Sequence, residues 1–221
     1  MSSARRERAR FLFERTIRDR LGVILPYVEG RDVLDVGCVD SRPSRDTAEG
    51  RVLRPNLLHK RLAAAEGAHV LGVDVDREGI EALSRLGLSA ICADAETMDL
   101  GRTFDTIIAG EVIEHMENPG RFLRNLRRHL RPDGVLIVTT PNPFSAAQAW
   151  RIWRHGRPRV HEDHLGWQDP ATLSALLRRT GFEPFAGYWF QPKRRLVKTW
   201  KRILRPYFST HIVVLARRAG P

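Results

Sequence analysis

A regular alternation of short apolar runs with amphipathic helical segments most constrains the fold of this chain. Seven runs rich in β-branched and aromatic residues are predicted strands, at 32–37, 69–73, 88–92, 104–109, 135–140, 182–190 and 208–216. The predicted helices between them lie at 57–66, 77–86, 119–130, 145–155 and 170–180. Strands that alternate with helices favour right-handed crossovers and a mostly parallel sheet with helices on both faces. The sequence therefore predicts an α/β, Rossmann-like fold with a seven-stranded sheet.

The domain organisation follows from length and from the segments outside this alternation. At about 150 residues per domain, 221 residues predict a single domain over 1–221. Apolar residues at helical spacing predict an N-terminal amphipathic helix at about 5–25. The polar, proline-containing segment 41–56 and the basic segment 191–206 are predicted insertions.

The composition indicates the cellular compartment and the kind of partner to expect. Lys and Arg total 37 against 26 Asp and Glu, so the formal net charge is +11 and anionic partners are favoured. The chain has two cysteines, Cys38 and Cys92, which argues against a disulfide framework and for a reducing cytoplasm. No apolar run approaches the roughly 20 residues of a membrane span, and the charged N-terminus does not resemble a signal peptide. We expect a cytoplasmic protein.

Polar and small residues gather just after four predicted strands, where open α/β sheets bind ligands. They are Asp35, Gly37 and Cys38 after the first strand, Asp74 and Val75 after the second, Asp94 and Ala95 after the third, and Gly110 and Glu111 after the fourth. A carboxylate such as Asp74 can accept hydrogen bonds from both hydroxyls of a ribose. Gly37 allows close approach of a ligand to the backbone. A single strand-end Asp more often serves a turn, but the set together predicts a nucleotide site.

Four motifs in order resemble those of class I S-adenosylmethionine-dependent methyltransferases. They are VLDVGC at 33–38, LGVDVD at 71–76, CADAETMDL at 92–100, and the segment 104–143. The resemblance implies S-adenosyl-L-methionine as cofactor. It places Asp35, Gly37 and Cys38 at the methionine end, Asp74 at the ribose, and Asp94 with Ala95 at the adenine. Val75 and Gly110 are expected beside them.

The glycine-rich turn departs from the family pattern. Val39 and Ser41 stand where the family usually has its later glycines, and the interval from Asp35 to Asp74 is longer than usual. The missing glycines also argue against a dinucleotide dehydrogenase, because a pyrophosphate needs a Gly-x-Gly-x-x-Gly turn.

Acidic and histidine side chains follow the strand at 104–109. Glu111, Glu114 and His115 are spaced i, i+3 and i+4, which places them on one face if the segment is helical. Together with His164 from the cluster 161–164, they are predicted to hold Mg²⁺ or Mn²⁺. The pattern resembles the metal site of small-RNA 3′-terminal 2′-O-methyltransferases and a segment of ubiquinone-biosynthesis O-methyltransferases. The alternative is a helix-capping, pocket-lining segment without metal.

The same residues are the catalytic candidates. Methylation of a hydroxyl releases a proton, and imidazole titrates near neutral pH. His115 or His164 is therefore a candidate general base, with Glu111 as a third catalytic candidate.

The acceptor is predicted from weaker signals. The segment from His164 to Trp167 resembles one in small saccharide methyltransferases, which favours a sugar or glycan hydroxyl. A metal-dependent RNA ribose 2′-O-methyltransferase, a methyltransferase for phenols or small metabolites, and a non-catalytic basic binding module remain alternatives. Trp150 and Trp153 either roof the acceptor pocket with His155, Arg157 and Arg159 or belong to the core.

The basic segment 193–205 has seven cations and no acidic residue. It is predicted to contact an anionic polymer or a membrane surface, or to pack on the sheet edge with a solvated basic face. Because family members often vary here or use the region as a dimer contact, a homodimer is also expected.

Overall fold

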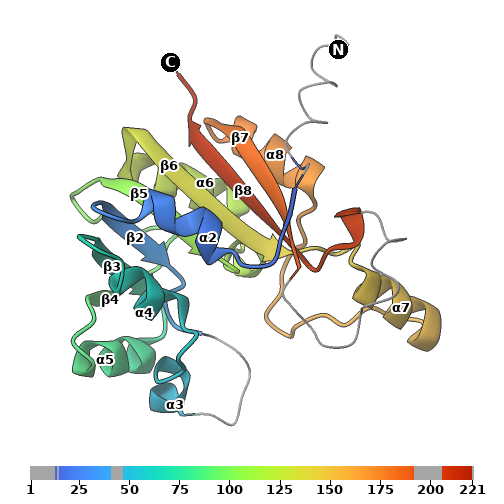
Figure 1. The fold of residues 1–221 in the computed structure, drawn as a ribbon, viewed down its shortest axis with the longest axis horizontal. Coiled ribbons are helices and arrows are strands. Elements are labelled where there is room, and N and C mark those ends of the chain that lie inside the picture. Colours follow the sequence, from blue (N-terminus) through green and yellow to red (C-terminus); the bar gives the residue numbers. More distant parts are fainter. Residues whose placement is uncertain (1–12, 14, 41–46, 192–205, 221) are drawn as a thin grey trace.

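The computed structural model describes residues 13, 15–40, 47–191 and 206–220. They form one eight-stranded sheet in the order β1-β7-β8-β6-β5-β2-β3-β4 (Figure 1). The strands are β1 Arg15–Ile17, β2 Asp32–Val36, β3 His69–Asp74, β4 Ala90–Cys92, β5 Phe104–Gly110, β6 Leu130–Pro141, β7 Phe182–Phe190 and β8 His211–Arg218. The helices are α2 Leu21–Ile24, α3 Ala48–Val52, α4 Leu58–Ala63, α5 Arg77–Arg85, α6 Pro119–His129, α7 Ala146–His155 and α8 Pro170–Arg179. Single 3₁₀ turns are η1 Leu25–Tyr27, η2 Ile113–His115 and η4 Pro206–Phe208.

The sheet is mostly parallel, as predicted. Strand β2 lies between β3 and β5, and both pairings are parallel, as are β3–β4, β5–β6 and β1–β7. Strand β8 is antiparallel to both β6 and β7. Seven strands correspond to the predicted ones, and the eighth is β1.

The eighth strand corrects the prediction of a helix at 5–25. Within the described residues this segment forms β1, the one-turn helix α2 and η1. Strand β1 pairs Thr16 with Trp189 of β7, and the ring of Phe13 lies 5.3 Å from the ring of Trp189. Tertiary pairing with a sheet edge therefore overrides the helical spacing of the apolar residues.

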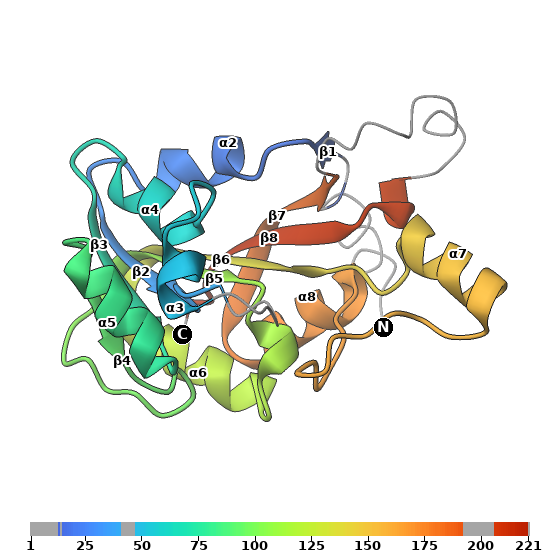
Figure 2. The same cartoon turned by 90° about the horizontal axis from the view of Figure 1, so that it is seen from below.

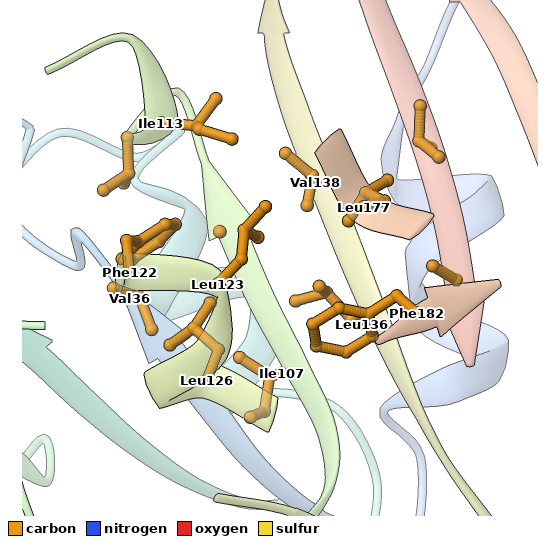
Figure 3. Packing of buried hydrophobic residues seen from close by; sticks show 14 of the residues in the cluster. Val36, Ile107, Ile113, Phe122, Leu123, Leu126, Leu136, Val138, Leu177 and Phe182 are labelled. Carbon is orange, nitrogen blue, oxygen red and sulfur yellow. The ribbon is translucent and has the colours of Figure 1, made fainter. Parts of the chain in front are cut away.

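Helices cover both faces of the sheet (Figure 2). Helices α6 and α8 pack on one face, and α2 and α4 on the other. Leu123 and Leu126 of α6 lie close to Ile107 of β5, and Leu177 of α8 lies beside Val138 of β6 (Figure 3). Full burial of such a side chain contributes about 1.5–3 kcal/mol to folding. These two layers hold the strand ends in place.

Helix α6 begins where the sequence predicts. The side chain of Asn118 accepts a hydrogen bond from the backbone N–H of Arg121 at 2.9 Å, and Pro119 occupies the first turn. Phe122, Leu123 and Leu126 are fully buried. Capping by Asn and proline at the first helical position explain the start of the helix.

Two segments decorate this core. The predicted insertion 41–56 contains α3, whose N-cap Thr47 accepts a hydrogen bond from the Gly50 N–H at 3.2 Å; residues 41–46 lie outside the described part. Helix α7 projects from the body of the molecule and has no buried residue (Figures 1 and 2). Segment 193–205, predicted to bind anions, also lies outside the described residues. Among the residues described, no helix has the length and apolarity to cross a membrane.

Candidate functional site

The carboxyl ends of β2, β3, β4 and β5 lie side by side at one edge of the sheet, because these strands are parallel neighbours. The predicted cofactor residues lie in the last residues of these strands or just after them. They are Asp35, Gly37, Cys38, Asp74, Val75, Asp94, Ala95 and Gly110. The edge is therefore the candidate active site.

Gly37 turns the chain at the end of β2. Its φ of +74° is in the left-handed region, and a Cβ atom there would lie 2.3 Å from Cγ2 of Val112. Its N–H donates to the carbonyl of Val73 at 2.8 Å. Both the backbone conformation and the contact with the loop after β5 require glycine.

Cys38 follows this turn and is buried. Burial, together with the nearby carboxylates of Asp35 and Asp74, raises the pKa of its thiol far above the usual value. The thiol therefore stays protonated and is a packing group rather than a nucleophile.

Asp35 is also buried, and its partner comes from α4. Its Oδ2 lies 3.1 Å from Nδ1 of His59, which is completely buried. A Cβ atom at Gly72 of the neighbouring strand would lie 2.8 Å from Cε1 of His59 and 2.7 Å from Sγ of Cys38. Asp35 therefore fixes α4 beneath the cofactor loop. Any role at the methionine end of the cofactor stays a prediction.

Asp74, the last residue of β3, binds the loop that follows β2. Its Oδ2 accepts the backbone N–H of Val39 at 2.9 Å, and its Oδ1 accepts that of Asp76 at 3.0 Å. Burial raises the pKa of this carboxyl group. Each oxygen retains a second lone pair, so the carboxylate can still accept hydrogen bonds from ribose hydroxyls, and this contact stays a prediction.

Asp94 and Ala95 form the turn after β4. The carboxylate of Asp94 accepts hydrogen bonds from the Glu96 N–H and the Thr97 hydroxyl, each at 2.8 Å. Nδ2 of Asn125 in α6 donates to the carbonyl of Ala95 at 3.0 Å. Val75 is 69% exposed, which leaves an apolar surface near this turn for an adenine ring. Their contact with the cofactor stays a prediction.

The prediction that Glu111, Glu114 and His115 share one helical face is wrong for Glu111. After Gly110 ends β5, Glu111 adopts a left-handed φ of 60°, and η2 replaces a regular helix. Its Oε1 accepts the hydroxyl hydrogen of Thr139 at 2.9 Å and lies 3.7 Å from Arg20, while its Oε2 lies 3.4 Å from His211. Glu111 therefore faces β6 and β8, apart from the other predicted metal ligands.

The remaining three predicted ligands do meet. Potential ligand atoms of Glu114, His115 and His164 lie within 4.8 Å of one another. The rings of His115 and His164 are 4.7 Å apart and nearly perpendicular. The ring of His161 lies 5.4 Å from that of His164 and 6.0 Å from that of His115, so a third histidine joins the group. We call His115, His161 and His164 the histidine cluster.

A hydrogen bond fixes which nitrogen of His115 is available. Its Nδ1 lies 3.0 Å from the carbonyl oxygen of Asp163. Because a carbonyl oxygen only accepts hydrogen bonds, Nδ1 carries the hydrogen. In the neutral ring the lone pair is then on Nε2, where it can accept a proton or bind a cation.

Burial sets the protonation of Glu114. Thr140 donates its hydroxyl hydrogen to Oε2 at 2.9 Å, whereas Oε1 is buried and has no hydrogen-bond partner among the residues described. Burial, and next the charge of Glu111, raises the pKa of Glu114 to about 8. The carboxyl group is therefore mostly neutral at pH 7 in the absence of a bound cation.

Partial burial and the neighbouring His115 and His161 lower the pKa of His164. The segment that carries it is tied to η2, because the backbone N–H groups of Leu165 and Gly166 donate to the Glu114 carbonyl at 2.8 and 3.1 Å. His164 is therefore a neutral imidazole held beside His115 at pH 7.

Helix α7 resolves the two interpretations of its tryptophans. Trp150 and Trp153 are exposed, 60% and 74%, and their ring centroids lie 4.8 Å apart with the planes tilted by 35°. The core interpretation is therefore wrong.

Solved structures show which fold this chain shares. A SAM-dependent methyltransferase from Archaeoglobus fulgidus superposes with a TM-score of 0.63 at 19% identity, over 90% of this chain and 91% of that chain. The CcbJ methyltransferase from Streptomyces caelestis gives 0.63 at 16% identity, over 93% and 91%. The [4+2]-cyclase SpnF gives 0.56 at 17% identity, over 95% and 87%. The fold is that of class I S-adenosylmethionine-dependent methyltransferases, as the resemblance implied, and the fold by itself does not fix the reaction.

The sequence matches a family model directly. Residues 4–186 match the model described as a methyltransferase domain. The chain therefore belongs to this methyltransferase family, and its fold implies S-adenosyl-L-methionine as cofactor.

Curated relatives are ubiquinone biosynthesis O-methyltransferases. The one from Bradyrhizobium diazoefficiens is 31% identical over 136 residues, 59% of this chain and 46% of the relative. The one from Azorhizobium caulinodans is 30% identical over 189 residues, 76% and 65%. The chain thus spans about half the length of the first of these relatives and two thirds of the second.

Proposed function

We propose that this protein transfers a methyl group from S-adenosylmethionine to a hydroxyl oxygen, with the histidine cluster as the general base. The observation that carries this proposal is the hydrogen bond from His115 Nδ1 to the Asp163 carbonyl, which leaves Nε2 as the proton acceptor. His164, with its lowered pKa, lies beside it in the neutral form. The named activity of the curated relatives supports oxygen as the methylated atom.

The strand ends suit a cationic cofactor. Although the chain has a net charge of +11, the acidic residues Asp74, Asp94 and Glu111 gather at the carboxyl ends of β3, β4 and β5. S-adenosylmethionine supplies a methyl group already activated by a positive sulfur. The protein must then bind it through Asp74 and the Gly37 turn, orient the hydroxyl, and remove its proton.

The acidity of the acceptor favours an aromatic hydroxyl. A phenol has a pKa of about 10, only a few units above that of an imidazole, whereas an aliphatic sugar hydroxyl is far less acidic. A histidine base therefore removes a phenolic proton more readily. The relatives act in ubiquinone biosynthesis by name, and this also favours a phenol over the predicted sugar or glycan. The saccharide acceptor and the RNA ribose acceptor remain the alternatives.

A metal-assisted version is the second candidate. Glu114, His115 and His164 offer one carboxylate oxygen and two imidazole nitrogens that could hold a divalent ion, and Oε1 of Glu114 has no hydrogen-bond partner among the described residues. With two nitrogen ligands and without Glu111, the set suits Mn²⁺ better than Mg²⁺. An ion held there would lower the pKa of an acceptor hydroxyl. Glu111 would not hold it directly in this conformation, because Thr139, Arg20 and His211 surround its carboxylate.

Two further predictions concern partners. Contact of 193–205 with an anionic polymer or membrane surface, and a homodimer, rest on the sequence alone. The single-domain organisation and the cytoplasmic setting also stay predictions.

The proposal is tested by transfer of labelled methyl from S-adenosylmethionine to catechols, saccharides and short RNAs, each with and without chelator. We expect label on a catechol that persists in chelator. Label that disappears in chelator would establish the metal-assisted candidate. Label on RNA or saccharide alone would overturn the aromatic acceptor, and absence of transfer with intact S-adenosylhomocysteine binding would favour a binding module.

A further inference from the structure

A basic cavity lies at the end of α7, outside the strand-end site. It has a volume of about 760 Å³. Its lining consists of Arg151, His155, Arg157, Pro158, Arg159 and Val160. Three arginines and one histidine are therefore among the six lining residues.

Hydrogen bonds hold the two walls of this cavity together. Nε2 of Gln148 donates to the carbonyl of Arg159 at 2.6 Å, and the N–H of Arg159 donates to Oε1 of Gln148 at 3.0 Å. Gly156 ends the helix in the left-handed conformation, and its N–H donates to the Ile152 carbonyl at 2.8 Å. The loop after α7 is thus folded back along the helix, and Arg157 and Arg159 line the same cavity as Arg151.

The positive charges of the cavity are not neutralised within the described residues. Arg151, Arg157 and Arg159 have no carboxylate partner there, whereas Arg131 contacts both Asp32 and Asp105. Like charges that line one cavity repel one another, and a bound anion reduces this repulsion. Guanidinium groups bind phosphate oxygens in pairs, and three of them match a dianionic group better than a single carboxylate.

We propose that this cavity binds a phosphate group, carried by a small molecule or by a lipid headgroup. Val160 lines the cavity and directly precedes His161 of the histidine cluster in the chain, so the cavity adjoins the segment that carries His161 and His164. The acceptor of the methyl group is the natural carrier of the phosphate. That last assignment rests on the proposed function, while phosphate binding itself does not.

The test is titration of the full-length protein with inorganic phosphate, without methyl donor, followed by calorimetry. The variant Arg157→Gln/Arg159→Gln should bind phosphate at least about tenfold more weakly. Arg154→Gln is the matched control, because Arg154 is an exposed arginine of the same helix that does not line the cavity. S-adenosylhomocysteine binding should be unchanged in all variants, which would show that they are folded. Because phosphate binding is measured without methyl transfer, its loss is distinguishable from failure of the proposed function.

Two arms distinguish the sources of phosphate. If the carrier is a lipid, vesicles containing phosphatidic acid, whose phosphate monoester can carry two negative charges, should bind the wild type, release it when inorganic phosphate is added, and bind the double variant less. If the carrier is soluble, phenyl phosphate should compete with inorganic phosphate while vesicle binding is insensitive to the double variant. The proposal is overturned if the wild type shows no saturable phosphate binding, or if Arg154→Gln weakens it as much as the double variant.

Discussion

Nδ1 of His59 lies 3.1 Å from Oδ2 of Asp35, and both side chains are almost completely buried. His59 belongs to α4 and Asp35 to β2, so this contact ties the helix to the strand that carries the Gly37 turn. Nε2 of His59 has no hydrogen-bond partner within the part of the chain that the structure describes. The pair is thus a buried polar contact that holds α4 against the strand preceding the Gly37 turn.

Removal of the Asp35 carboxylate should destabilise the fold. In Asp35→Ala the buried Nδ1 of His59 loses its partner, which costs about 1–3 kcal/mol in the free energy of unfolding. Asp133→Ala, an exposed position of β6, should cost well under 1 kcal/mol and is the control. Denaturant unfolding measures both, and equal costs would show that the pair does not support the fold.

Gly37→Ala should lower the free energy of unfolding by more than the cost of placing alanine at a left-handed φ. Gly87 has the same φ of +74° but nothing within 4 Å of an added Cβ, so Gly87→Ala measures the conformational cost, about 1 kcal/mol. Gly37→Ala adds the clash with Val112 and should cost about 1–3 kcal/mol more. Val112→Ala in the Gly37→Ala background should recover part of that excess. Equal costs for Gly37→Ala and Gly87→Ala in thermal unfolding would contradict the crowding.

Asp74→Ala should weaken cofactor binding. If its carboxylate binds the ribose, the loss of charged hydrogen bonds costs about 1.5–3 kcal/mol, or about 10- to 150-fold in the affinity for S-adenosylhomocysteine. Asp76→Ala is the control, because Asp76 caps α5 nearby through the Gly79 N–H. Unchanged affinity for Asp74→Ala in calorimetry would refute the ribose role.

Glu114 should make stability depend on pH. Its pKa rises from 4.5 to about 8 on folding, so the folded state binds more protons than the unfolded state between these values. Its contribution is fully present below about pH 4.5 and is lost as the pH rises through about 8. Glu114→Gln should flatten this decline in unfolding free energy with pH. An identical slope in both proteins would show that the group is not held neutral.

Much of the fold could be predicted from local sequence signals. The strands from 32 onward and the start of α6 at Asn118 and Pro119 follow from periodicity and capping, which are local. Strand β1 could not be predicted in this way, because it depends on pairing with β7, far along the chain.

Part of the candidate site could also be predicted from local spacing in the sequence. Spacing brought Glu114 and His115 together, and the cluster 161–164 supplied His164 and also His161. The position of Glu111 could not be predicted, since its left-handed φ and its contacts with Thr139 and His211 depend on the assembled sheet. His59, next to Asp35, has no sequence motif that signals its burial.

The central claim is that the histidine cluster removes the proton of an acceptor hydroxyl. The most direct measurement compares the rate of methyl transfer to a responsive acceptor in the wild type, His115→Gln and His69→Gln. His69 is the control, because its side chain is 80% exposed at the start of β3. We predict that His115→Gln lowers the rate by about 10²- to 10⁴-fold while its affinity for S-adenosylhomocysteine matches that of the wild type. A rate within a few-fold of the His69→Gln value would contradict the account.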